Sequence, residues 1–133
     1  MKGKYLNRTF YDDTNTFWHS QGEYARWKQL EAMQEKGMIE GLRRQVRYPL
    51  DIHFTVNGEN YVEPCTWISD FDYIENGILV SEDFKSSYTE KMPEFARKRR
   101  LFQIMYGRDI RVFIAGKGVV KASTKSRIRK TTK

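Results

Sequence analysis

Residues 68–85 read Ile68-Ser69-Asp70-Phe71-Asp72-Tyr73-Ile74-Glu75-Asn76-Gly77-Ile78-Leu79-Val80-Ser81-Glu82-Asp83-Phe84-Lys85. Two apolar-rich runs in this stretch meet at Asn76-Gly77. This dipeptide is the one most typical of a two-residue hairpin turn, because a type I′ turn requires positive φ at both central residues. We therefore predict two antiparallel strands joined by a tight turn.

The register of this hairpin brings two carboxylates together. Counting outward from the turn places Asp70 opposite Asp83. Side chains alternate between the two faces of a strand, so Lys85 shares the face of Asp83, whereas Phe84 points to an aromatic face. Facing carboxylates about 5 Å apart repel each other unless a cation lies between them. Their oxygens suit a hard divalent metal; the alternative is a solvated face with arbitrary charges.

Length and composition limit the classes of protein that fit. A chain of 133 residues predicts one domain, and three Trp, eight Tyr and eight Phe argue against disorder throughout. No apolar run approaches the roughly 18 to 20 residues of a membrane span, and the N-terminus lacks the apolar segment of a signal peptide. We expect a soluble, cytoplasmic protein without membrane contact. The single cysteine, Cys65, excludes an internal disulfide.

The formal charge of +7 is concentrated at the C-terminal end. Residues 1–120 hold 18 basic and 17 acidic side chains, so the remaining residues carry six of the seven positive charges. Such a run is typical of a disordered tail that contacts phosphates without regard to sequence, and the alternative is a role in solubility. The basic residues of this tail are Lys121, Lys125, Arg127, Arg129, Lys130 and Lys133.

Capping and turn signals predict the other elements. Ser20-Gln21-Gly22-Glu23 has the form of a capping box, in which Ser20 caps a helix and Glu23 reaches back to a free backbone N–H. Pro93 suits the first turn of a second helix, and glycines suit the ends of both helices. The expected elements, in order, are a helix from Ser20 to Gly37, strand-like runs over 45–56 and 61–75 that meet at Asn57-Gly58 and are interrupted at Pro49 and Pro64, a strand over 78–85, a linker over 86–92, a helix from Pro93 to Tyr106 and a strand over 109–115.

This order, α-β-β-β-α-β, predicts an α/β fold with a small mixed central sheet flanked by helices. A helix that connects the strand over 78–85 to the strand over 109–115 implies that these two strands run parallel. The core is expected over 20–118, between an N-terminal arm over 1–19 and a basic, disordered tail over 119–133.

The order and spacing of four motifs resemble the PD-(D/E)xK nuclease superfamily. The similarity is strongest to small phage endonucleases, including junction-resolving endonuclease I enzymes and a phage family of uncharacterised nuclease-like proteins. It extends over about residues 20–115 and implies a restriction-endonuclease-like core. One departure is Ser69, which stands where the family pattern has proline before the first aspartate. The motifs are Ser20-Gln21-Gly22-Glu23, Asp70-Phe71, Asn76-Gly77 and Asp83-Phe84-Lys85.

The resemblance implies a Mg²⁺-dependent phage DNA endonuclease that hydrolyses phosphodiester bonds. Analogy further implies selectivity for Holliday or other branched junctions, a homodimer that makes paired cuts, and a site of action in the host cytoplasm. Two alternatives are kept. One is a nuclease for linear or single-stranded DNA in recombination or restriction. The other is a DNA-binding accessory protein that retains the fold without the activity.

The resemblance also implies roles for individual residues. Asp70, Asp83 and the backbone carbonyl of Phe84 would hold Mg²⁺, with Mn²⁺ as a substitute, and Glu23 would complete the shell. Lys85 would position the attacking water or stabilise negative charge. Each has a simpler alternative, since Glu23 could only close the capping box and Lys85 could only pair with Asp83.

Two neighbouring acids are alternative candidates for the metal-ligand positions assigned to Asp70 and Asp83. Asp72 shares the face of Asp70, and we interpret it as a solvated neighbour or an outer-sphere group. Glu82 falls on the aromatic face and has no lysine two residues later.

Basic side chains outside the motifs are candidates for phosphate contacts. Arg97 and Arg100 are i, i+3 neighbours on the second helix, and Gln103 extends their row. The alternative is an ordinary solvated helix face. Arg43, Arg44 and Arg47 form another possible set of phosphate contacts, and the basic tail adds further candidate DNA contacts.

Overall fold

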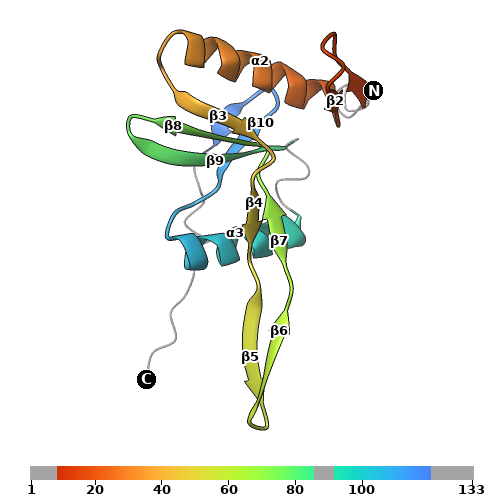
Figure 1. Cartoon of the computed structure of the whole chain (residues 1–133), viewed down its shortest axis with the longest axis vertical. Coiled ribbons are helices and arrows are strands. Elements are labelled where there is room, and N and C mark those ends of the chain that lie inside the picture. Colours follow the sequence, from red (N-terminus) through yellow and green to blue (C-terminus); the bar gives the residue numbers. More distant parts are fainter. Residues whose placement is uncertain (1–8, 86–91, 121–133) are drawn as a thin grey trace.

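The computed structural model describes residues 9–85 and 92–120. A five-stranded mixed sheet with the order β11-β10-β9-β8-β3 lies between two helices (Figure 1). The helices are α2 (Gln21–Glu35) and α3 (Pro93–Tyr106), and the strands of the central sheet are β3 (Glu40–Arg44), β8 (Phe71–Glu75), β9 (Ile78–Lys85), β10 (Arg111–Ile114) and β11 (Gly118–Val120). Three two-stranded ladders complete the fold: β1 (Phe10–Tyr11) with β2 (Phe17–Trp18), β4 (Arg47–Pro49) with β7 (Thr66–Ile68), and β5 (Ile52–Val56) with β6 (Glu59–Glu63).

The hairpin β8–β9 forms the centre of the sheet with the predicted register. Asn76 and Gly77 have φ values of 54° and 77°, as the tight turn requires. Asp72 lies opposite Ser81, and the Asp70 N–H donates to the Glu82 carbonyl oxygen at 3.0 Å. The mixed α/β class and the parallel pairing of β9 with β10 are confirmed.

The predicted helix ends are also confirmed. Ser20 Oγ accepts a hydrogen bond from the Glu23 N–H at 3.0 Å, and Gly37, just after the C-terminal end of α2, has a φ of 79°. Pro93 begins α3, and Gly107 ends it with a φ of 70°. No helix within the described residues has the length and apolar character needed to cross a membrane.

The prediction that the runs over 45–56 and 61–75 form the first two strands of the central sheet is wrong. They break near Pro49 and Pro64 into shorter strands. Strands β4 and β7 pair with each other, and β5 and β6 continue beyond them as a hairpin that projects from the body (Figure 1). Only β8, the last part of the second run, enters the central sheet.

The edge strand β3 was not predicted. Its sequence, residues 40–44, has a single large apolar side chain, Leu42, and therefore no alternating pattern. Gly41 has a φ of 65°, and the register against β8 shifts between Glu40 and Arg43. This irregularity is a β-bulge, which disrupts the period-two signal of a strand.

Each face of the central sheet packs against one helix. Side-chain alternation places Phe71 and Glu82 on the face that α2 covers, and Asp83 and Val112 on the opposite face, with α3. Two buried clusters follow from this division. The first contains Trp18, Leu30, Ile39, Phe71, Tyr73 and Val80; the second contains Tyr48, Leu50, Trp67, Phe95, Phe102, Ile110, Val112 and Ile114.

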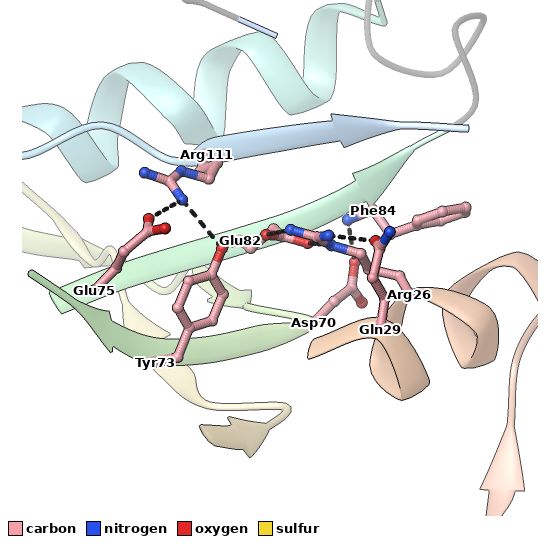
Figure 2. Close-up of polar contacts among 8 residues, drawn as sticks. All are labelled: Arg26, Gln29, Asp70, Tyr73, Glu75, Glu82, Phe84 and Arg111. Atoms are coloured by element: carbon pink, nitrogen blue, oxygen red, sulfur yellow. Dashed lines mark hydrogen bonds and ion pairs between the residues drawn. The ribbon is translucent and has the colours of Figure 1, made fainter. Parts of the chain in front are cut away.

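A buried ion pair connects α2 to the sheet. Glu82 is fully buried, and Arg26 binds it through two hydrogen bonds, from Nε to Oε2 at 2.6 Å and from Nη2 to Oε1 at 2.8 Å. Tyr73 donates a third bond to Oε1 at 2.5 Å (Figure 2). The guanidinium also lies 4.0 Å from the centre of the Phe113 ring. The buried carboxylate of Glu82 is thus fully compensated, as burial of a charge requires.

We predict that Glu82→Leu destabilises the protein by about 3 to 5 kcal/mol, because it leaves the Arg26 guanidinium buried without a counter-charge. The double variant Arg26→Met/Glu82→Leu should be considerably more stable than the single variant, since no unpaired charge then remains. Urea unfolding followed by circular dichroism measures both free energies.

The matched control is Glu31→Leu, which removes an exposed pair with Lys28 at 3.0 Å. Its effect on the free energy of unfolding should be small compared with that of Glu82→Leu, because the pair is screened by solvent. Equal losses for Glu82→Leu and this control would contradict a structural role for the buried pair.

Candidate functional site

A group of carboxylates lies where β8 begins and β9 ends. Asp83 and Lys85 project from β9, Asp70 immediately precedes β8, and Glu23 lies in the first turn of α2. Arg44, on strand β3, lies beside Glu23. Four separate parts of the chain therefore meet at one end of the central sheet.

Asp70 is connected directly to β9. Its Oδ2 accepts a hydrogen bond from the backbone N–H of Phe84 at 2.7 Å (Figure 2). Burial raises the pKa of Asp70 well above its ordinary value, and the nearby charges of Asp83 and Glu23 raise it further. The ionised form of this carboxylate is therefore disfavoured by its surroundings.

Asp83 and Lys85 lie on the same face, as the alternation of β9 predicted. Lys85 Nζ is 3.0 Å from Asp83 Oδ2. This contact is an ion pair without hydrogen-bond geometry, so the buried Oδ2 has no hydrogen-bond partner among the described residues. Burial raises the pKa of Asp83, although the charge of Lys85 acts in the opposite direction. The ammonium of Lys85 also lies 4.5 Å from the centre of the Phe95 ring.

Glu23 is held near Arg44. Its Oε2 lies 4.0 Å from Arg44 Nη2 and, within the described part of the chain, accepts no hydrogen bond. Burial raises the pKa of Glu23, opposed by the charges of Arg44 and His19. Arg44 stacks over Trp18 at 3.5 Å from the ring centre. Sequence reasoning treated Arg44 only as a DNA contact, because β3 was not recognised and its position beside Glu23 could not be inferred.

Of the two interpretations of Asp72, as a solvated neighbour or as an outer-sphere group, the first is wrong. Asp72 is fully buried, and its two oxygens accept hydrogen bonds from the Tyr48 hydroxyl and, at 2.6 Å, from Ser69 Oγ. Arg43 Nη2 lies 3.8 Å away. Because both oxygens of Asp72 are already bonded, Asp70 is the better candidate of the two for a ligand.

These carboxylates have the chemical character of a cation site. Glu23 and Asp83 each have one buried carboxylate oxygen without a hydrogen-bond partner among the described residues, and the charges of both raise the pKa of Asp70. Over residues 9–85 and 92–120, no three or more His, Cys, Asp or Glu side chains form a ready-made metal cluster. A cation here would therefore take few side-chain ligands and complete its shell with backbone, water or phosphate oxygens, the arrangement typical of Mg²⁺.

A cavity of about 660 Å³ opens beside Asp83 and Lys85. Lys98 of α3 contributes to its wall, whereas Arg97 and Arg100 lie on the exposed surface of the helix. Of the carboxylate group, Asp83 lines this cavity, whose other charged wall residues are Glu94, Lys85 and Lys98, so the charges of the wall are balanced.

The other predicted DNA contacts differ in whether the structure leaves them exposed, bonds them within the fold or does not describe them. Arg43 is exposed on the edge strand β3, and its nearest carboxylate is that of Asp72. Gln103 does not extend the row of Arg97 and Arg100, because its side chain donates to Asp109 Oδ1 at 2.8 Å. The linker over 86–91 and the basic tail residues Lys121, Lys125, Arg127, Arg129, Lys130 and Lys133 lie outside the described residues.

Residues 2–123 match the model of the family described as protein of unknown function (DUF1064). The chain belongs to the DUF1064 family. The match includes both helices, the whole central sheet and every residue of the carboxylate group. No curated protein and no solved structure matches this DUF1064 chain significantly.

We predict that Asp70→Asn stabilises the DUF1064 chain by about 0.5 to 2 kcal/mol in EDTA at neutral pH. Asparagine can still accept the bond from Phe84 but carries no charge. Because the folded-state pKa of Asp70 is raised, its charge costs stability only as the pH rises above the ordinary aspartate pKa. Thermal unfolding measured at several pH values should show the advantage of the variant disappearing near pH 4.

The control for this prediction is Asp13→Asn, which removes an exposed carboxylate. It should leave the free energy of unfolding within about 0.5 kcal/mol of the unmodified protein. A loss of stability for Asp70→Asn at neutral pH would mean that the charge of Asp70 is compensated in the folded protein.

Proposed function

We propose that the protein is a Mg²⁺-dependent DNA endonuclease of the PD-(D/E)xK type, with a restriction-endonuclease-like core. The observation that carries the proposal is the group formed by Asp70, Asp83 and Lys85, in which the buried Asp83 and its partner Lys85 line a cavity and the half-buried Asp70 adjoins Asp83. Perturbed acids beside a cavity are typical of catalytic sites.

The order of the helices and central-sheet strands along the chain supports a restriction-endonuclease-like core. Helix α2, strands β3, β8 and β9, helix α3 and strand β10 follow each other in the order α-β-β-β-α-β. This is the order expected for the nuclease core, although β3 replaces the run over 45–56 as its first strand. The ladders β4–β7 and β5–β6 are then an insertion between the first and second strands of the core.

Each residue of the group has a role that its position permits. Asp70 and Asp83, with the backbone carbonyl of Phe84, would hold the metal, and Glu23 would contact it through water. Bound Mg²⁺ supplies Lewis-acid chemistry that activates water and offsets charge on a phosphate. Lys85 would orient the attacking water through its ammonium or stabilise negative charge that develops on the phosphate.

Basic side chains on α3 and β3 support a nucleic-acid substrate. Lys98 contributes to the cavity wall together with Glu94, and Arg43 is exposed on the edge strand β3, 3.8 Å from Asp72. Both can contact phosphates flanking the cleaved bond, an interaction that is independent of base sequence. The preference for a branched junction is supported only by the sequence resemblance, so cleavage of linear or single-stranded DNA is the alternative.

We predict Mg²⁺-dependent cleavage of a four-way DNA junction by the purified protein, and no cleavage in EDTA. Asp83→Ala and Lys85→Ala should each reduce the rate at least about 100-fold, because they remove a metal ligand and a charge-stabilising group. Gel assays with junction, linear duplex and single-stranded DNA separate the substrate classes. The matched controls are Asp13→Ala and Lys36→Ala, both at exposed positions, which should cleave normally.

The outcomes discriminate between the proposed functions. Symmetric nicks confined to the junction would support a junction-resolving enzyme, whereas equal cleavage of linear duplex would support the alternative nuclease. Metal-independent DNA binding without cleavage of any substrate would refute the enzyme and favour a DNA-binding accessory protein.

We also predict that removal of residues 121–133 weakens DNA binding and reduces its salt dependence. This segment carries six of the seven net positive charges. Each phosphate contact that is lost should lower the slope of log K against log salt concentration by about 0.9. Fluorescence anisotropy at several salt concentrations measures the slope, and an unchanged slope would show that the tail makes no phosphate contacts.

A further inference from the structure

Strands β1 and β2 form a hairpin (residues 10–18) that packs where α2 begins (Figure 1). The ring of Tyr24, in the first turns of α2, lies 5.3 Å from that of Phe10 and 5.2 Å from that of Trp18, measured between ring centres. Trp18 is 1% exposed. Because Glu23 precedes Tyr24, the hairpin reaches the edge of the carboxylate group.

The indole of Trp18 is fixed by Asp12. Its Nε1 donates a hydrogen bond to Asp12 Oδ2 at 2.8 Å. The other oxygen of this carboxylate, Oδ1, accepts from the backbone N–H groups of Thr14 and Thr16, both at 2.9 Å. One oxygen of Asp12 thus holds the turn of the hairpin, and the other holds the plane of the indole ring.

Arg44 of strand β3 lies on this ring. Its guanidinium carbon is 3.5 Å from the centre of the Trp18 ring. A guanidinium that stacks by its face keeps its N–H donors at the edge of its plane, where they can bind an oxyanion. The Nε of Arg44 is buried and has no hydrogen-bond partner in the described parts of the chain. A buried donor without a partner costs stability, so this donor calls for a ligand.

Glu23 does not satisfy Arg44. Its Oε2 lies 4.0 Å from Arg44 Nη2, too long for a hydrogen bond, and this oxygen also has no bonded partner among the described residues. The structural pair of Arg26 with Glu82 is different, because its two hydrogen bonds are 2.6 and 2.8 Å long. Arg44 is therefore held by stacking rather than by an internal ion pair of this kind.

Arg44 and Lys85 approach the carboxylates from opposite faces of the sheet. The register pairs Arg44 with Phe71, on the face that α2 covers, whereas Lys85 lies on the face of α3. Burial lowers the pKa of Arg44, and the charges of Glu23 and Asp70 act in the opposite direction. An anion bound at the carboxylates through a metal would thus meet a cation on each side.

We propose that Arg44, held in place by Trp18 and Asp12, binds the non-bridging oxygens of the phosphodiester that occupies the carboxylate site. The flat guanidinium suits two oxygens of one phosphate. Trp18 and Asp12 are positioning residues that act through Arg44, so the β1–β2 hairpin belongs to the active site. The inference rests on the proposed metal site at Asp70 and Asp83.

Two measurements on the full chain with Mg²⁺ test the role of Arg44. Phosphorus NMR titration of dimethyl phosphate measures binding of the smallest phosphodiester, and Arg44→Gln should raise its Kd about 10-fold. For the four-way DNA junction the same variant should lower kcat about 100-fold and change KM less than about threefold, because the contact is strongest in the transition state. Arg44→Lys should recover little of either loss, since ammonium cannot replace a stacked guanidinium.

The positioning role is tested by Asp12→Asn, which keeps Oδ1 but replaces Oδ2 with an amide nitrogen that cannot accept the indole N–H. It should raise the Kd of dimethyl phosphate about threefold, and Trp18→Phe should act in the same direction. Neither change should have a further effect in the Arg44→Gln background, because both act through Arg44. The matched controls are Asp13→Asn and Lys36→Gln, at exposed positions, which should bind dimethyl phosphate normally. Circular dichroism verifies that every variant is folded.

Binding of dimethyl phosphate requires no cleavage, so this inference and the nuclease activity can fail separately. A protein that binds dimethyl phosphate through Arg44 but cleaves no DNA would refute the nuclease and support the phosphodiester site. The inference is overturned if the unmodified protein does not bind dimethyl phosphate or if Arg44→Gln binds it equally well. An Arg44→Gln enzyme that is altered only in KM would place Arg44 on a flanking phosphate instead. Additive effects of Asp12→Asn and Arg44→Gln would contradict the positioning role.

Discussion

The tight turn at Asn76-Gly77 is the constraint on which the rest of the structure depends. It fixes the register of β8 against β9, and a strand shifted by one residue presents every side chain to the opposite face. With the observed register, Glu82 faces α2 and Asp83 faces the cavity beside α3. Two adjacent acids thereby acquire entirely different surroundings.

Glu82 and Asp83 differ in whether their buried oxygens have hydrogen-bond partners. Glu82 is enclosed by Arg26 and Tyr73, which satisfy both of its oxygens. Asp83 is equally buried but shares its surroundings with two further carboxylates, and one of its oxygens has no hydrogen bond among the described residues. The first arrangement stabilises the fold, whereas the second costs stability, a cost that is characteristic of functional sites.

Sequence reasoning identified the elements whose signals are local. The Asn76-Gly77 turn, the Ser20 cap and the Pro93 helix start each depend on one or two residues with specific backbone preferences, and the structure agrees at all three. Strand β3 was missed because a bulge removes its alternating pattern. The burial of Asp72 was missed for a different reason: Tyr48 lies 24 residues away in sequence, and only the tertiary arrangement of β4 brings its hydroxyl to this carboxylate.

The hairpin of β5 and β6 lies between the two strands of the β4–β7 ladder in the sequence. Pairing within this hairpin brings the ends of β4 and β7 together, so the ladder can close without the entropy cost of ordering a long free loop. Hairpins of this size form within microseconds, much faster than pairings between distant segments. The Asn57-Gly58 turn therefore lowers the entropy cost of bringing together Tyr48 and Trp67, which stack on each other in the core beside α3.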